Sequence, residues 1–387
     1  MRKHVIEALA GGAWLICGLI ASGCGGDAGG PLEPLEPIIP AIEDNPGTLL
    51  FTGSVRASGW PIIVAPHLTW SADGGELFFL QAPEEGFAVS GVPVSGGSVR
   101  HLYETDELLE PMYLQRPAGS HWLYFLLNNS TQRDVWQIDS RSMNGAELMV
   151  TPPFLSSGRL AVSSDERWFA LGSWFPTQEL HLLDTFAQTW RTLPLDHEPL
   201  SFSPDGSLLL TRSLWLISVA DGLAQELAHG PSWGSVLRSN WLNDPVPHWT
   251  GNRLQFLLVE SIPANGAPGA RVSFFDAQTG DARQVATIGP LANWEPYCAL
   301  GAPCPPPTGS TSPDGRKLAL WVLRRDLSRG NDPRSWPHQI HLVDLETSAV
   351  RIVATASGEL SGDITFSPNG QNLAYFIGRH LYLVTGL

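Results

Sequence analysis

The chain has 387 residues and a formal net charge of −15 at pH 7, with 38 acidic residues against 23 Lys and Arg. This acidic balance disfavours binding to nucleic acid or to anionic lipid through charge. Charged residues make up only 16% of the chain, compared with roughly a quarter in typical domains, whereas Gly (39), Pro (32) and Trp (15) are plentiful. Such a composition suits many tight turns and aromatic strands packed on both faces.

Residues 1–23 are predicted to be a secretory signal peptide. The pair Arg2-Lys3 precedes an apolar stretch that is too short to span a bilayer comfortably and ends in small residues before Cys24. A cysteine directly after Ala-Ser-Gly resembles the cleavage box of bacterial lipoproteins, which implies lipidation of Cys24. Ordinary cleavage beside an incidental cysteine is the alternative. Removal of residues 1–23 takes away two positive charges and one negative charge and leaves a mature charge of −16.

Residues 24–46 are predicted to be a tether. A Gly-rich start is followed by the proline-spaced stretch Pro-Leu-Glu-Pro-Leu-Glu-Pro-Ile-Ile-Pro at 31–40. Such a segment is semi-rigid and extended, so we expect it to hold the following domain away from a membrane.

From residue 47 onward a short phrase keeps returning. Its clearest copies are Trp70-Ser-Ala-Asp-Gly-Gly75, Phe202-Ser-Pro-Asp-Gly206, Thr311-Ser-Pro-Asp-Gly315 and Phe366-Ser-Pro-Asn-Gly370, each followed by a short apolar run. Pro presets φ, Asp bonds its own backbone and Gly accepts a positive φ, so each copy predicts a β-hairpin turn. Weaker copies at 116–119, 163–166 and 249–252 bring the number of units to seven, and their spacing fits repeats of roughly 40 to 50 residues.

Each unit also carries a second hairpin, in which one strand ends at an acidic residue and the next opens with arginine. The acidic ends include Asp139, Asp184, Asp276 and Asp344, and the openings include Arg100, Arg191, Arg283 and Arg351. Four antiparallel strands per unit make a propeller blade. We therefore predict an all-β fold over residues 47–387, a seven-bladed β-propeller of four-stranded antiparallel blades, with six or eight blades as alternatives.

The last unit stops short, with strands at 364–367, 372–377 and 380–384 but no fourth strand before Leu387. The unassigned stretch 48–54 precedes the first unit and is free to supply the missing outer strand. We expect the N-terminal strand to join the last blade and close the ring.

These repeats resemble the TolB-like and WD-type β-propellers, whose blades combine Ser-Pro-Asp-Gly, an aliphatic strand, a strand ending in Asp, and then Arg and Leu. The resemblance covers residues from about 47 to 387. It implies the fold but leaves the function open, because such propellers serve as periplasmic scaffolds, as gating domains of peptidases and occasionally as sugar-processing enzymes.

None of the apparent catalytic motifs has the structural setting that its chemistry requires. Gly230-Pro-Ser-Trp-Gly234 matches the nucleophile-elbow pattern but lies in a connector rather than between a strand and a helix. His338 and His341 are spaced as a metal pair, yet residues three apart on a strand point to opposite faces. We predict no catalytic residue and no cofactor, apart from a cation that could bind at the channel mouth.

Five acidic residues recur just before the predicted innermost strands: Glu110, Glu198, Asp244, Glu295 and Asp363. In a propeller these positions gather near one mouth of the central channel, where a carboxylate ring could hold a cation or a basic peptide. Alternatively, an acidic residue before Pro simply punctuates the start of a strand. Trp233, Trp241 and Trp294 lie in the same connectors and either present platforms for sugars or proteins or pack between blades.

Cys298 and Cys304 lie six positions apart in a Pro- and Gly-rich insertion. In an oxidising compartment this pair is expected to form a disulfide. Two free thiols and a metal site remain as alternatives.

Two functional classes follow. The preferred one is a non-enzymatic, membrane-anchored propeller that binds an envelope protein or glycan as a monomer. The alternative is a propeller-type carbohydrate lyase or hydrolase with a metal at the channel mouth, which would require three or more His, Asp or Glu side chains to converge there. The expected location is extracytoplasmic and lipid-anchored to a bacterial membrane, with the outer membrane preferred because Gly25 rather than Asp follows Cys24.

Overall fold

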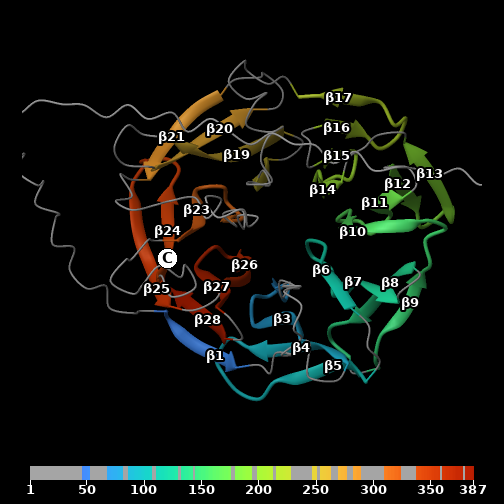
Figure 1. Cartoon of the computed structure of the whole chain (residues 1–387), viewed down its shortest axis with the longest axis horizontal. Coiled ribbons are helices and arrows are strands. Elements are labelled where there is room, and N and C mark those ends of the chain that lie inside the picture. The colour runs from blue at the N-terminus through green and yellow to red at the C-terminus, as the bar shows by residue number, and fades with distance from the viewer. Residues whose placement is uncertain are drawn as a thin grey trace, which may run out of the picture. The chain divides into compact units, whose positions relative to one another are not determined.

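The computed structural model describes residues 46–52, 68–81, 86–106, 110–129, 132–142, 144–175, 179–193, 198–211, 215–227, 246–250, 253–262, 269–276, 282–288, 309–323, 337–357, 360–377 and 380–387. They belong to one unit, Ile42–Leu387. Their strands form seven four-stranded antiparallel sheets, arranged as a ring of blades (Figure 1). The predicted seven-bladed β-propeller is confirmed.

Each blade is named here by its place in the chain, and its strands run from the innermost to the outermost. Blades 1 to 4 contain, in turn, β2 (Leu68–Trp70), β3 (Glu76–Gln81), β4 (Phe87–Pro93) and β5 (Arg100–Thr105); β6 (Glu110–Gln115), β7 (Trp122–Asn129), β8 (Gln132–Asp139) and β9 (Glu147–Val150); β10 (Leu155–Val162), β11 (Trp168–Phe175), β12 (Leu180–Asp184) and β13 (Thr189–Leu193); and β14 (Pro199–Phe202), β15 (Leu208–Thr211), β16 (Trp215–Ser218) and β17 (Ala224–Glu226).

Blades 5 to 7 complete the ring. They contain β18 (Val246–Thr250), β19 (Arg253–Ile262), β20 (Gly269–Asp276) and β21 (Ala282–Ile288); β22 (Gly309–Thr311), β23 (Lys317–Leu323), β24 (Pro337–Asp344) and β25 (Val350–Ser357); and β26 (Leu360–Phe366), β27 (Asn372–Ile377), β28 (His380–Thr385) and β1 (Thr48–Thr52).

The recurring phrase forms the turn between the first two strands of a blade. In blade 4, Gly206 has a φ of 71° and its amide donates to the Ser203 carbonyl at 2.8 Å. The Asp205 carboxylate accepts hydrogen bonds from the Ser203 hydroxyl and the Ser207 amide, at 2.7 and 3.0 Å. The Ser203 hydroxyl in turn accepts the Leu208 amide at 2.9 Å. The serine therefore fixes the turn together with Asp and Gly, which explains why it returns in each clear copy.

The hydrophobic core lies between the blades rather than within one of them. In the described part of the chain, each cluster of buried apolar side chains combines residues from two neighbouring blades. Phe78 and Phe87 of blade 1, for example, pack with Leu123 and Phe125 of blade 2. Residues that alternate along a strand contact the blade on either side, so both faces of each sheet are buried.

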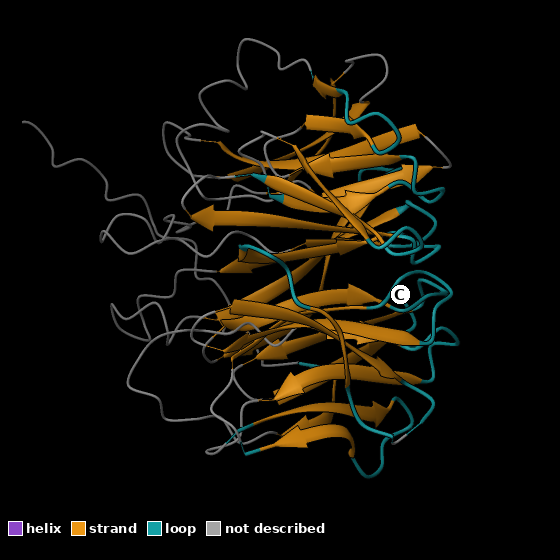
Figure 2. Cartoon of the chain, turned by 90° about the vertical axis from the view of Figure 1, so that its right-hand side faces the viewer, coloured by secondary structure: helices purple, strands orange, loops and turns teal. Residues whose placement is uncertain are grey.

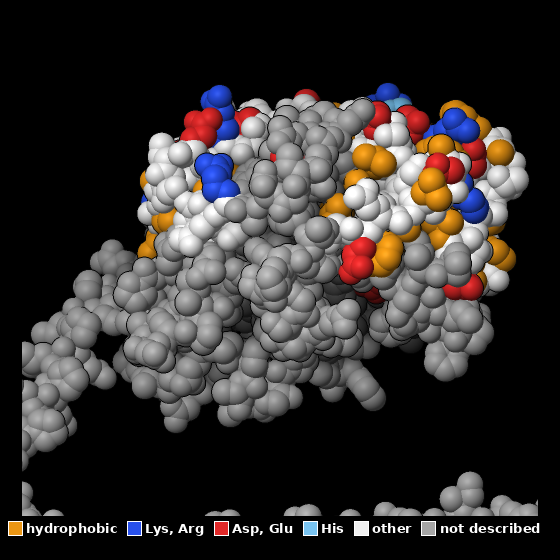
Figure 3. Space-filling model, turned by 90° about the horizontal axis from the view of Figure 1, so that it is seen from above, with side chains coloured by type: hydrophobic (Ala, Val, Ile, Leu, Met, Phe, Trp, Pro, Cys, Tyr) orange, Lys and Arg blue, Asp and Glu red, His pale blue; other side chains and the backbone are white. Residues whose placement is uncertain are grey.

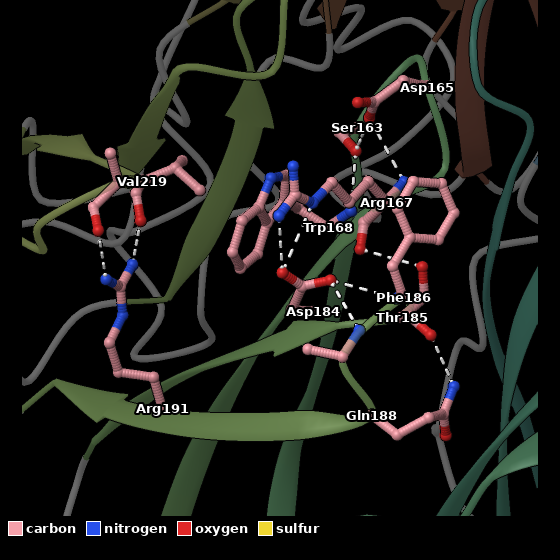
Figure 4. A network of polar contacts seen from close by, with 12 residues as sticks. Ser163, Asp165, Arg167, Trp168, Asp184, Thr185, Phe186, Gln188, Arg191 and Val219 are labelled. Carbon is pink, nitrogen blue, oxygen red and sulfur yellow. Dashed lines mark hydrogen bonds and ion pairs between the residues drawn. The ribbon is translucent and has the colours of Figure 1, made fainter.

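Arginines near the start of the outermost strands link adjacent blades at their rims. Arg191 of β13 donates to the Val219 and Ala220 carbonyls of blade 4 (Figure 4). Arg100 of β5 donates to the Ser140 carbonyl of blade 2 at 2.5 Å and forms a bidentate pair with Glu76 of its own blade. These contacts give the recurring arginine a structural role, because charge-assisted hydrogen bonds satisfy carbonyls of the next blade.

The ring is closed by both ends of the propeller, as the sequence predicts. Strand β1 pairs with β28 in antiparallel register, from Thr48 opposite Leu383 to Thr52 opposite His380. Gly47 precedes it with a φ of 87°, and a Cβ there would lie 2.5 Å from the Leu383 carbonyl oxygen. The buried Tyr375 donates its hydroxyl hydrogen bond to the Pro46 carbonyl. A glycine is therefore required where the chain turns into the closing strand.

No helix among the described residues is long and apolar enough to cross a membrane.

Candidate functional site

The strand order gives the propeller two unlike faces. The turns after the first and third strands of each blade lie on one face, here called the turn face, and Figure 2 shows the described turns gathered on one side of the strands. The innermost strands begin at the opposite face, here called the connector face. Residues at the start of an innermost strand therefore belong to the connector-face end of the channel, where we look for the predicted ring of acids.

Three of the five positions lie among the described residues. Glu110 is the first residue of β6, and Glu198 directly precedes β14. Asp363 does not precede its strand: β26 begins at Leu360, so Asp363 is its fourth residue. The backbones of these three residues thus lie toward the connector-face ends of blades 2, 4 and 7. Asp244 and Glu295, together with Trp233, Trp241, Trp294, Cys24, Cys298 and Cys304, lie outside the described residues.

Glu198 does not stand as an isolated carboxylate. Arg159 of β10 places its Nε 3.0 Å from Glu198 Oε2, and the two side chains are 17% and 23% exposed. The guanidinium of Arg159 also lies over the ring of Tyr113, 5.7 Å from its centroid. The contacts form a row across the innermost strands of blades 2, 3 and 4, which combines an aromatic ring, a cation and an anion. A partly buried ion pair of this kind is screened less by salt than an exposed one.

The row coincides with irregularities in all three innermost strands. The pairing register shifts between Met112 and Gln115 in β6, between Ser156 and Leu160 in β10, and between Pro199 and Ser201 in β14. Tyr113 itself has a φ of 52°, which is strained for a bulky side chain. Bulges redirect side chains and are enriched next to functional sites, as is backbone strain. The geometry therefore marks this part of the channel lining as the candidate site.

A fourth irregularity lies in blade 7, where the β26 register shifts between Leu360 and Ile364. This interval contains Asp363. Asp363 therefore lies in a register shift of an innermost strand, as the strands of the Tyr113–Arg159–Glu198 row also have.

The opposite mouth has its own acidic residues, which the sequence analysis assigned to turns alone. Asp73, Asp165, Asp205 and Asp314 are exposed in the turns after the innermost strands, and each accepts a hydrogen bond from the serine two positions before it. That bond lowers the pKa of Asp73 and of Asp314. The carboxylates of Asp73 and Asp314 are therefore ionised at pH 7, and all four aspartates have a clear role in fixing the turns.

Charges of both signs are mixed on the part of the described surface that Figure 3 shows. In the view of Figure 3, acidic and basic side chains lie next to one another rather than in separate regions. Arg316 and Glu346 form an exposed pair in the turns at 3.2 Å, and the exposed Arg141 pairs at 3.1 Å with Asp139, the partly buried last residue of β8. Within the described ranges, no group of three His, Cys, Asp or Glu residues is arranged to hold a metal ion.

The two candidate histidines of blade 6 point apart, as expected for residues three apart on a strand. His338 meets Trp321 edge-on, with ring centroids 6.1 Å apart, on the side of β24 where Ile340 packs against blade 7. His341 lies on the other side of the strand, where Val343 packs against blade 5. They cannot share a metal ion.

The comparisons with known proteins support the fold. No family model matches the chain, and no curated protein matches its sequence. Among solved structures, an oligogalacturonate lyase in complex with manganese is 15% identical, over 89% of this chain and 98% of that one, with a TM-score of 0.58. The β-propeller domain of Cps50 (Swd1) from Myceliophteria thermophila is 12% identical, over 88% and 99%, with a TM-score of 0.53. TolB from Acinetobacter baumannii is 13% identical, over 83% and 63%, but its TM-score of 0.41 is too low to bear on the fold. The chain has the β-propeller fold. At these identities the likeness extends no further than the fold.

Sequence reasoning missed Arg159 and Tyr113. The search for the ring considered carboxylates only, and Arg159 is 39 positions before Glu198 in another blade. The signal that could have pointed to Arg159 is a positively charged residue in the innermost strand of the blade next to that of Glu198. Nothing in the residue type of Tyr113 indicates a positive φ.

Proposed function

We propose that this protein is a non-enzymatic propeller scaffold, lipid-anchored in the bacterial envelope through Cys24, which binds an envelope protein or glycan with its connector face. The lipoprotein-like sequence before Cys24 supports the anchor and an extracytoplasmic location, with the outer membrane preferred. The TolB-like repeat pattern of the sequence is consistent with that location.

The observation that carries the choice of face is the row formed by Tyr113, Arg159 and Glu198. It concentrates backbone strain, bulged innermost strands and a partly buried ion pair on the channel lining, and its Glu198 lies at the connector-face end, directly before β14. The turns of the opposite face are short and use their polar groups to fix themselves. Long connections on a rigid scaffold are the usual carriers of binding function, and the sequence places its longest ones, 228–245 and 289–308, before innermost strands.

Strand β1 runs antiparallel to β28, which ends on the turn face, so β1 begins on the turn face. Of the predicted acids, Glu198 is paired with Arg159, so we assign the attraction for a basic partner chiefly to Glu110, Asp244, Glu295 and Asp363.

The test is a pull-down from detergent-solubilised envelopes with the full-length lipoprotein as bait. We expect Glu295→Gln combined with Trp294→Ala to lose a partner that the wild type retains, and we expect added salt to weaken the retained complex because charge pairs at the mouth are screened. Glu198→Gln breaks the Arg159 pair, so its unfolding midpoint is measured alongside its binding.

Glu346→Gln is the matched control, because it removes an exposed carboxylate, 64% accessible, from the turn face. Retention of every partner by all the connector-face variants would overturn the assignment of the face. Cleavage of a polysaccharide by the purified protein would replace the scaffold role with the lyase or hydrolase alternative.

A further inference from the structure

The two most exposed large hydrophobic side chains among the described residues lie on neighbouring blades of the turn face. Phe186, in the turn between β12 and β13 of blade 3, is 78% exposed, and Leu223, in the turn between β16 and β17 of blade 4, is 71% exposed. The other large hydrophobic side chains that are exposed in this part of the chain belong to outermost strands. Ala187 and Ala220, in the same two turns, are exposed as well. These four residues are here called the apolar rim.

The turn of blade 3 does not itself require an apolar residue at position 186. The Asp184 carboxylate accepts the amides of Phe186 and of the residue after it, at 3.0 and 3.1 Å. In blade 6 the Asp344 carboxylate accepts the amides of Glu346 and of the residue after it in the same way, at 3.0 and 2.7 Å. The same hydrogen-bonded turn thus carries an exposed carboxylate in one blade and an exposed phenyl ring in another. Folding of the turn accounts for the aspartate but not for the ring.

The ring of Phe186 is held in place by a neutralised cation. Arg167 pairs with Asp184 at 2.8 Å, and its guanidinium lies 5.0 Å from the centroid of the Trp168 ring and 5.7 Å from that of Phe186 (Figure 4). Because the arginine is already paired, the ring beside it can leave water without taking an unpaired charge along, which would be costly.

The turn of blade 4 is fixed to blade 3. Arg191 of blade 3 donates to the Val219 and Ala220 carbonyls, and the Leu223 amide donates to the Asp221 carboxylate at 3.1 Å. The two halves of the apolar rim therefore belong to one rigid surface. A surface that is ordered before it binds loses little conformational entropy on binding.

The apolar rim lies across the ring from the strand at which the described chain begins. Strand β1 starts on the turn face of blade 7, and blades 3 and 4 are the two blades on the opposite side of the ring (Figure 1). Pro46, the first described residue, follows Cys24 by 22 positions, a stretch that spans at most about 80 Å. A lipid on Cys24 would therefore keep the turn face within this distance of a bilayer.

We propose that Phe186 and Leu223 insert into the interface of the bilayer that carries the anchor, so that the turn face rests on zwitterionic lipid. This inference rests on the proposed lipid anchor. Apolar side chains gain free energy on leaving water, and the anchor makes their contact with the bilayer intramolecular, so weak affinity is sufficient. The net charge of −15 and exposed carboxylates such as Asp165 disfavour an anionic surface.

The experiment measures whether a fluorescent label on the apolar rim reaches the lipid. The lipoprotein, with Cys24 native, is placed in phosphatidylcholine vesicles that contain nitroxide-labelled lipid, and the label is attached at Ala187→Cys. We expect quenching of this label that persists at high salt, because the contact is apolar and is not screened. Protein without the added cysteine, treated in parallel, gives the background from other thiols.

Two substitutions test the side chains themselves. Phe186→Glu gives blade 3 the residue that the same turn carries in blade 6, so the fold is retained. It should lower the ratio of quenched to unquenched label at least about tenfold, the equivalent of about 1.4 kcal/mol, because burial of a phenylalanine is worth at least that much. Leu223→Asn should lower the ratio as well. Ile352→Asn is the matched control, since Ile352 is 51% exposed on an outermost strand, and it should leave the ratio unchanged.

Anchored protein whose label at position 187 is not quenched would overturn this inference and leave the scaffold and its anchor standing. A wild type that does not stay with the vesicles would contradict the proposed anchor and this inference with it. Equal quenching in Phe186→Glu, or loss of quenching at high salt, would also overturn the inference. So would energy transfer between labels on different copies without quenching by lipid, because a second copy of the chain would then cover the apolar rim.

Discussion

The buried histidine of blade 6 predicts a specific dependence of stability on pH. His341 is 6% exposed, and its Nε2 lies 3.2 Å from Gln339 Oε1. Its Nδ1 has no partner within the described part of the chain. On the same side of β24, Leu318, Leu320 and Val343 pack against Val272 of blade 5. Burial lowers the pKa of His341 from 6.5 to about 4.

The sign follows from proton linkage. Between pH 6.5 and pH 4 the unfolded chain carries a proton on this histidine and the folded chain does not. The stabilising contribution is therefore complete above pH 6.5 and is lost as the pH falls toward 4. A difference of about 2.5 pKa units at 1.36 kcal/mol each amounts to about 3 kcal/mol of unfolding free energy.

The assay is urea unfolding of the wild type and of His341→Leu at a series of pH values from 7.5 to 4. Carboxylates and other histidines titrate in both proteins, so the difference between the two curves isolates His341. We expect the wild type to lose about 3 kcal/mol more than the variant across this range. Parallel curves would show that His341 is protonated or solvated in the folded state and would refute the reasoning.

Three further predictions concern the closing strand, an interface between blades, and the insertion before β22. Gly47→Ala should lower the free energy of unfolding by more than the roughly 1 kcal/mol cost of a positive φ, because its Cβ would also meet the Leu383 carbonyl. Gly386 has a φ of 73° and open space around it, so Gly386→Ala should cost only the positive-φ energy, and thermal unfolding measures both variants. Tyr124→Phe should lower the free energy of unfolding in urea by about 1.5 kcal/mol, because it removes the 2.8 Å hydrogen bond to Glu166 of the next blade. When Tyr124→Phe is already present, Glu166→Gly should raise the free energy of unfolding, because Glu166 has a φ of 60°. A further decrease in the free energy of unfolding would contradict the account. Thiol counting on exported, unfolded protein should find Cys298 and Cys304 oxidised, and free thiols at both positions would exclude the disulfide.

The fold could be predicted from the sequence because each hairpin has its own local sequence signal. Asp and Gly at fixed turn positions predict the reversal at Phe202–Gly206 without reference to any other blade, and the apolar run that follows the turn forms β15, Leu208–Thr211. The missing fourth strand of the last unit pointed to residues 48–54 for the same reason, since an unpaired edge needs a partner.

The candidate site was harder to predict from the sequence because its contacts join residues of different blades. The partner of Glu198 is a cation in the neighbouring blade. The displacement of Asp363 depends on a bulge that no residue type announces. Local propensity specifies where strands reverse, whereas the side chains that meet across blades depend on register.

The most direct test of the envelope-scaffold account is the state of Cys24 in the native protein. Intact-mass analysis of the membrane and soluble fractions would be carried out for the wild type and for Cys24→Ser. The account predicts that the wild type is membrane-bound, starts at Cys24 and carries the added mass of more than one acyl chain, which stable anchoring requires, while Cys24→Ser is released as soluble exported protein. A wild type that is soluble and has no lipid mass would contradict the account.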